Sequence, residues 1–154
     1  QSLLDATQPP GRRYYWKSHY LGGFDSGAAD AVIAHARCVR SPHSAILLFQ
    51  VQGALNEQPA LHSAAGNRDA GFVANIAGSW DRATDDEANV GWARACFGDL
   101  RPYSTGGVYV NFLNADEGAD RTAAAYGGGV LERLAELKRR FDPQGLFRHT
   151  KAVV

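Results

Sequence analysis

The chain has 154 residues, enough for one domain that buries roughly 70% of the surface exposed by its unfolded form. Its 16 Lys and Arg residues balance 16 Asp and Glu residues, so the composition indicates no basic face for nucleic acid or an anionic membrane. No apolar run approaches the ~20 residues of a membrane-spanning helix, and no secretory signal is visible at the start. We therefore expect one globular domain in the cytoplasm that binds neither nucleic acid nor membrane.

The first part of the chain predicts a strand, a helix and a second strand. An aromatic-rich strand is expected over 12–21. Ser26 is the expected N-cap of a helix that runs to about Arg40, because apolar residues recur there at helical spacing. Residues 44–51 are apolar at both alternating sets of positions, which predicts a central strand that is buried on both faces.

The middle of the chain completes a sheet. Residues 71–77 predict a third strand, and Thr84 and Glu87 have the spacing of a capping box that opens a helix ending near Phe97. A last strand is expected over 108–113. The resulting order β-α-β-β-α-β predicts an α+β fold of the ferredoxin-like type, in which a four-stranded antiparallel sheet carries two helices on one face.

Two further helices are expected after the sheet, near 120–126 and over 130–141. The second has an apolar stripe at helical spacing, and a proline follows its end. We divide the chain into 1–113, which holds the sheet and its helices, and 114–154, the C-terminal helical segment. We expect these two parts to form one structural unit.

Several kinds of site are disfavoured by the motifs. The five histidines show no metal-ligand spacing, so we expect no metal. The glycines at 127–129 lack the Lys-Ser/Thr pair of a phosphate-binding loop. Cys38 and Cys96 lie in expected helices and are interpreted as two small buried hydrophobic residues, with a disulfide between them as the alternative.

One face of a ferredoxin-like sheet is left uncovered by its own helices, so it meets solvent, a partner or a ligand. Strand alternation assigns a mixture of aromatic and polar side chains to this face: Tyr15, Lys17, His19, Asn75, Tyr109 and Asn111. Such a mixture suits the wall of a small-molecule or cofactor site. A half-solvated antiparallel sheet alternates in the same way, so alternation by itself leaves both interpretations open.

The last third of the chain contains a series of short motifs. They are Tyr-x-Asn-Phe at 109–112, Tyr-Gly at 126–127, Arg-Leu-x-x-x-Lys at 133–138 and Asp-Pro-x-x-x-Phe at 142–147. In this order they resemble the C-terminal signature of the berberine-bridge-enzyme-like FAD-linked oxidases. Weaker matches at Lys17-Ser18 and Trp80 extend the resemblance over nearly the whole chain.

The resemblance implies an FAD-dependent oxidation in which this chain supplies the substrate domain. In the family, a separate N-terminal domain holds FAD, and the substrate-domain sheet lies over the isoalloxazine ring. A hydride passes from the substrate to the flavin while a side chain on the sheet takes a proton. The implied partners are therefore an FAD-binding domain or subunit and a small-molecule substrate.

The resemblance also assigns roles to particular residues. Tyr109 and Asn111 are expected near the flavin, with Tyr109 as the acid/base candidate. Phe112 stands where many plant-type members have a second Tyr, and a phenyl ring cannot take a proton. Strand alternation would also place Phe112 on the face opposite Tyr109 and Asn111. The full set of expected substrate-binding residues is Lys17, Phe49, Asn75 and Phe112.

Two functions follow as hypotheses. The first is the substrate-binding part of an FAD-dependent oxidoreductase, with the isolated chain expected to be inactive. Gly129 and Gly145 stand where the family usually has Asn, which weakens the expected contacts with the flavin domain. The second hypothesis is a non-enzymatic ferredoxin-like module that forms a homodimer or binds a ligand through its bare sheet face.

Overall fold

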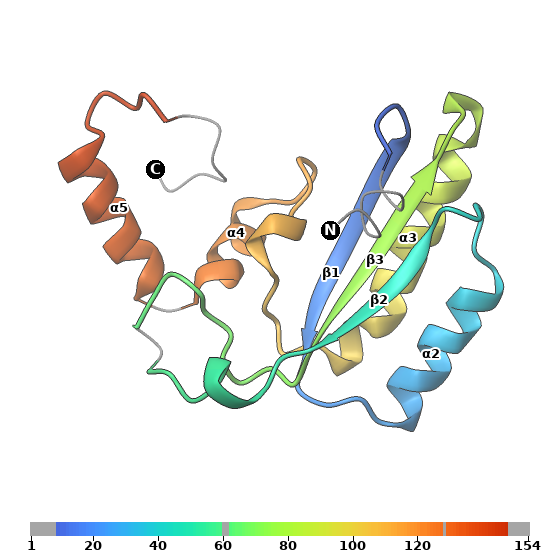
Figure 1. Ribbon diagram of the computed structural model, residues 1–154, viewed down its shortest axis with the longest axis horizontal. Coiled ribbons are helices and arrows are strands. Elements are labelled where there is room, and N and C mark those ends of the chain that lie inside the picture. The colour runs from blue at the N-terminus through green and yellow to red at the C-terminus, as the bar shows by residue number, and fades with distance from the viewer. Residues whose placement is uncertain (1–8, 60–61, 128, 148–154) are drawn as a thin grey trace.

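Three strands form one antiparallel sheet in the computed structural model, which describes residues 9–59, 62–127 and 129–147. The strands β1 (Arg13–Leu21) and β2 (Ala45–Gln50) both pair with β3 (Phe72–Trp80), which gives the spatial order β1-β3-β2 (Figure 1). β3 is buried along almost its whole length because it has a neighbour on each side. The mixed helix and strand content confirms the α+β class.

β2 is an edge strand, so the prediction of a central strand over 44–51 is wrong. Leu47, Leu48 and Phe49 are 40%, 38% and 46% exposed. Burial on both faces therefore does not explain why residues 44–51 are apolar. One face of β2 lies on the side of the helices, and the other lines a cavity described below.

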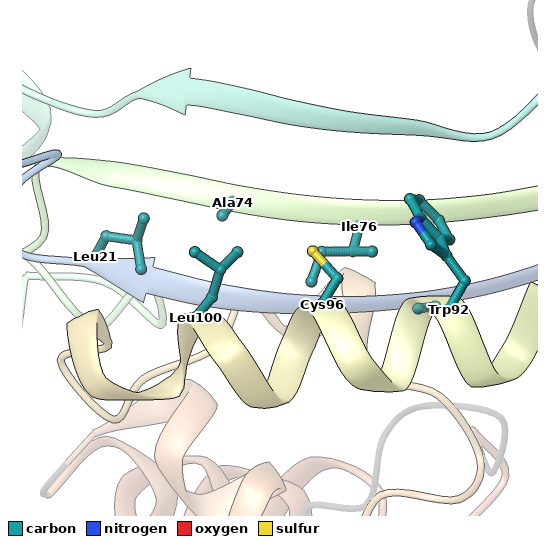
Figure 2. Packing of buried hydrophobic residues seen from close by; sticks show 7 residues of the cluster. Leu21, Ala74, Ile76, Trp92, Cys96 and Leu100 are labelled. Carbon is teal, nitrogen blue, oxygen red and sulfur yellow. The ribbon is translucent and has the colours of Figure 1, made fainter. Parts of the chain in front are cut away.

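Two helices cover one face of the sheet (Figure 1). α2 (Ser26–Arg37) begins after Asp25, whose carboxylate accepts a hydrogen bond of 2.9 Å from the backbone N–H of Ala28. α3 (Asp86–Leu100) packs against β1 and β3. Its side chains Trp92, Cys96 and Leu100 meet Leu21, Ala74 and Ile76 of the sheet, as Figure 2 shows. This cluster is the main hydrophobic core.

The expected fourth strand over 108–113 does not form, so the four-stranded ferredoxin-like sheet is not obtained. An isolated bridge joins Leu21 to Ser104, and Tyr20 exchanges backbone hydrogen bonds with Thr105 and Gly107 before the chain leaves the edge of β1. Side chains then satisfy this edge: Asn114 Nδ2 donates to Trp16 O, and Arg121 Nη2 donates to Ser18 O over 2.8 Å. The carbonyls that a strand would have paired are thus paired by side chains.

The side chains of β1 face the opposite way from the prediction. Tyr15, Lys17 and His19 were expected on the uncovered face, but they lie on the side of α3. The His19 ring stacks on Phe97 of α3 with centroids 4.0 Å apart, and Arg94 of α3 donates to Tyr15 Oη over 3.0 Å. The even-numbered residues of β1 therefore face away from the helices.

The C-terminal helices lie beside the sheet and not on it (Figure 1). α4 (Ala119–Tyr126) follows a 3₁₀ turn over Val110–Phe112, and α5 (Val130–Phe141) runs at the edge of the molecule with its last residue 71% exposed. Asp142 ends α5 and pairs with Lys138 one turn earlier. Within the described ranges no helix is long and apolar enough to cross a membrane.

The two cysteines are free and differ in environment. Cys96 is buried in the core, as predicted, whereas Cys38 is exposed at the C-terminal end of α2. The prediction of two buried cysteines is therefore wrong for Cys38. α2 ends at Arg37, before the expected end near Arg40, and this leaves residue 38 outside the packed surface of the helix.

Candidate functional site

A cavity of about 410 Å³ lies on the face of the sheet that α2 and α3 leave uncovered. Small-molecule sites have volumes of roughly 300–1,000 Å³, so this cavity has the size of a ligand pocket. The sheet, residues 51–56 and 65–68, and the turn that follows Tyr109 contribute to it. Its lining residues are Tyr20, Phe49, Val51, Leu55, Asn56, Ala65, Gly66, Asn67, Arg68, Val73, Tyr109 and Phe112.

The floor of the cavity is one row across the sheet. Tyr20 of β1 and Phe49 of β2 are both paired with Val73 of β3, so the three side chains lie side by side on the same face. Directly paired residues of antiparallel strands have close Cβ atoms, which makes this row a continuous surface. The sheet register thereby joins two aromatic rings across a small aliphatic residue.

The turn after the sheet supplies two further aromatic rings. Tyr109 and Phe112 lie at positions i and i+3 of the 3₁₀ turn, where side chains project in the same direction. Their rings meet edge to face with centroids 5.1 Å apart, and the Phe112 ring lies 6.4 Å from that of Phe49. The prediction that residue 112 lies opposite Tyr109 is therefore wrong, because it assumed a strand.

Two phenol groups border this cavity. The side-chain amide of Asn111 donates a hydrogen bond of 2.8 Å to Tyr109 Oη, while Tyr109 itself is 39% exposed. Burial and the neighbouring Tyr109 phenol raise the pKa of Tyr20, which keeps that phenol protonated at neutral pH. Through its hydrogen bond, Asn111 fixes the position of the Tyr109 phenol oxygen.

Asn67 joins the opposite wall to the C-terminal segment. Its Nδ2 donates to the carbonyls of Ala124 and Ala125 in α4, each over 3.1 Å, and its backbone adopts a positive φ of 57°. A Cβ atom at residue 107 would lie 1.9 Å from Asn67 Oδ1, so Gly107 is required at this contact. The contact positions the loop against the chain that leads to Tyr109.

The structure brings together only some of the expected site residues. Phe49, Tyr109 and Phe112 line the cavity. Asn75 faces the same side of the sheet as Phe49 but is 5% exposed and is not part of the lining. Asn111 is exposed beside Tyr109, whereas Lys17 lies on the helix side of the sheet, paired with acidic residues.

Tyr20, Asn56, Asn67 and Arg68 line the cavity but were not expected there. For Tyr20 a signal was present in the sequence: its neighbour Leu21 is aliphatic and ends the strand. Taking Leu21 as the residue that faces the core reverses the assignment of β1 and places Tyr20 on the open face. The loop residues have no comparable signal, because their positions depend on contacts with α4 and the turn.

Comparison with known proteins finds relatives of this chain. Residues 108–154 match the family model described as Berberine and berberine like. The chain is 30% identical over 83 residues to monolignol oxidoreductase AtBBE-like 13 of Arabidopsis thaliana, covering 47% of this chain and 16% of that protein. It is 24% identical to the aclacinomycin-N/aclacinomycin-A oxidase of Streptomyces galilaeus, covering 84% of this chain and 30% of that protein.

Solved structures share the fold. A glycopeptide hexose oxidase complexed with teicoplanin matches 94% of this chain and 32% of its own length, with a TM-score of 0.76 and 20% identity. A variant of berberine bridge enzyme matches 92% of this chain and 33% of its own length, with a TM-score of 0.76 and 16% identity. The chain thus spans about a third or less of the proteins it resembles.

The relatives that these matches name are oxidoreductases. Residues 108–154 thus resemble a berberine-like domain, and the relatives and structural neighbours of the chain include berberine-bridge-enzyme-like proteins, an oxidase and an oxidoreductase. The resemblance predicted from the motifs after residue 107 is therefore confirmed.

The lining of the cavity suits the isoalloxazine ring of FAD but not its diphosphate. Its aromatic walls, with Tyr109 exposed at the rim, suit the flat isoalloxazine ring or a planar substrate beside it. Arg68 is the one cation among the lining residues, and no glycine-rich turn that leads from a strand into a helix is among them. The lining residues therefore fit the ring of a flavin but lack a cradle for its diphosphate.

Proposed function

We propose that this chain forms the substrate-binding wall of an FAD-dependent oxidoreductase that acts on a small organic molecule. The flavin-binding domain would belong to a longer polypeptide or to a separate subunit. The observation that carries the proposal is the aromatic cavity formed by Tyr20, Phe49, Tyr109 and Phe112 on the uncovered face of the sheet. The family match supports it, because the relatives are FAD-linked oxidoreductases.

In this proposal FAD, when bound, accepts the hydride that the substrate carbon loses. The substrate hydroxyl loses a proton in the same oxidation, and Tyr109 Oη takes it after the phenol's own proton has passed to solvent. Asn111 holds that oxygen in place by the 2.8 Å hydrogen bond. Phe49 and Phe112 position a planar substrate and exclude water.

Lys17 does not contribute to this site. Its ammonium group is engaged with Asp116 and Glu117 on the far side of the sheet. Asn75 does not line the cavity but stays a candidate for substrate binding. Its Oδ1 atom is buried without a hydrogen-bond partner in the described part of the chain. An amide cannot act as a general base, so any role of Asn75 is one of binding.

The proposal predicts that the isolated chain does not hold FAD tightly, because its cavity has no phosphate cradle. Titration of the purified chain with FAD, followed by quenching of flavin fluorescence, measures this directly. Weak or absent binding is expected. Stoichiometric tight binding would show that this chain holds the whole cofactor and that the assignment to a substrate wall is wrong.

The decisive experiment uses the flavoprotein that contains this chain. Candidate substrates are added without oxygen, and the loss of oxidised-flavin absorbance reports substrate oxidation. Tyr109→Phe is expected to slow this reaction about 10²-fold or more, since it removes the general base. Tyr14→Phe, at the other end of β1, is the matched control and is expected to leave the rate unchanged. Equal rates in the two variants would exclude Tyr109 as the base.

A second function is favoured by the exposed edge of the sheet. β2 offers unpaired backbone groups and the exposed side chains of Leu47, Leu48 and Phe49. Such an edge can pair with a second copy of the chain. Light scattering over a concentration series tests this alternative: a dimer would support a non-enzymatic module, and a strict monomer would count against it.

A further inference from the structure

The cavity holds a positive charge that no carboxylate balances. Arg68 lines the cavity, and its Nη1 and Nη2 atoms donate to the carbonyl of Leu55 and, over 2.9 Å, to Ser63 Oγ. The structure gives Arg68 no ion pair within 4.0 Å among the residues that it describes. Its Nε–H group is buried and has no hydrogen-bond partner there. A buried donor without a partner is costly, so the hydrogen bonds within the described part of the chain do not use the full capacity of this guanidinium.

The other polar groups of the cavity do not supply the missing negative charge. None of the lining residues is Asp or Glu. The side-chain amide N–H groups of Asn56 and Asn67 are directed to backbone carbonyls. Burial keeps the Tyr20 phenol protonated, and Tyr109 Oη accepts its bond from Asn111. The lining residues therefore supply the cation Arg68 and no carboxylate to balance it.

We propose that the cavity selects planar organic substrates that carry an anionic oxygen group, a carboxylate above all, with Arg68 as the residue that recognises it. The inference rests on the proposed function, because it names the substrate class of the same site. The ring of such a substrate lies between the aromatic walls, and its carboxylate meets Arg68. A guanidinium is suited to a carboxylate by its charge and its planar set of donors.

Two probes of the same shape and different charge test the proposal on the isolated chain. Naphthoate and naphthalenemethanol are titrated by calorimetry, and naphthoate is expected to bind about tenfold more tightly, with an advantage that falls as salt is added. Arg68→Gln is expected to remove this preference by weakening the binding of naphthoate more than that of the alcohol. Arg139→Gln on α5 makes the same change in net charge outside the cavity and is expected to retain the preference.

Equal affinities for the two probes, no binding of either, or a preference that survives in Arg68→Gln would each overturn the proposal. Arg68 also holds the loop through Leu55 and Ser63, so circular dichroism of each variant is recorded. Arg68→Lys provides a second test if Arg68→Gln does not fold, and it is expected to keep part of the preference because it keeps the charge.

The outcomes separate this proposal from the proposed function. A preference for the anion without substrate oxidation in the assembled flavoprotein would support the role of Arg68 and reject the oxidase. Oxidation without a preference for anionic substrates would support the oxidase and reject the role of Arg68.

Discussion

Lys17 Nζ lies 3.0 Å from Asp116 Oδ1, although 99 residues separate the two in the chain. The same ammonium group lies 3.3 Å from Glu117 Oε1, and the side chains of Lys17 and Glu117 are only 9% and 4% exposed. Arg121 also pairs with Glu117 over 2.8 Å. This network ties the segment after the 3₁₀ turn to β1, so it holds Tyr109 and Phe112 in place over the sheet.

Lys17→Met is expected to lower the free energy of unfolding by about 2–3 kcal/mol, because it leaves a buried carboxylate with one partner fewer. The loss stays below that of a fully unpaired charge since Arg121 remains. Urea denaturation measures it, with Arg94→Gln as the control. Arg94 is 60% exposed, so its removal is expected to change stability by ~0.5 kcal/mol or less. Equal losses of unfolding free energy in the two variants would contradict a buried ion pair between Lys17 and Glu117.

His19 makes stability depend on pH. Burial lowers its pKa from 6.5 to about 4, and its Nε2–H donates to the carbonyl of Phe97 over 2.9 Å. The unfolded chain binds a proton at His19 between these two values and the folded chain does not, so stability falls as the pH is lowered from 6.5 to about 4. The expected loss is up to ~3 kcal/mol.

Denaturation curves across this pH range measure the loss for the native chain and for His19→Gln. The glutamine side chain does not titrate, so the variant is expected to show a flatter profile between the same limits. An unchanged slope in the variant would assign the pH dependence to other groups.

The two cysteines are expected to differ in reactivity toward a thiol reagent. Burial, and secondarily the charge of Asp99, raise the pKa of Cys96 to about 12, so almost no thiolate forms at neutral pH. Cys38 is free and exposed, so it is expected to react in the folded chain. Mass spectrometry after labelling is expected to find Cys38 modified alone, and both cysteines modified in denaturant. Labelling of Cys96 in the folded chain would contradict the described core.

Phe112→Tyr is expected to place a second phenol on the wall of the cavity, because residues 109 and 112 project to the same side of the turn. In the assembled flavoprotein, this substitution is expected to restore part of the rate lost in Tyr109→Phe, on the order of tenfold. The rate of anaerobic flavin reduction measures it. The double variant is compared with Tyr109→Phe alone, and equal rates would show that residue 112 does not reach the substrate.

Local patterns predicted most of the elements. The helix over 130–141 has the bounds expected for it, since its apolar stripe and the following proline are both local signals. The core role of Cys96 also follows from its place on a helix that has to cover a sheet. The presence of a site near Tyr109 and Phe49 was predicted from the resemblance to a family.

The remaining features depend on contacts between distant segments. The residues over 108–113 have high strand propensity, yet the edge of β1 that they would join is satisfied by Asn114 and Arg121, which follow later in the chain. The orientation of β1 was assigned wrongly because aromatic and polar residues occur on both of its faces. Arg68 had no signal at all, since its place in the cavity depends on the folded loop.

Phe112 lines the cavity from the turn over Val110–Phe112, and the backbone hydrogen bonds of this turn are separate from those of the sheet. These bonds, from Phe112 N to Tyr109 O and from Leu113 N to Val110 O, stay inside the turn. A side chain at position 112 can therefore be exchanged without loss of a strand pairing. Substitutions at residue 112 would therefore let the substrate change during evolution while the fold is preserved.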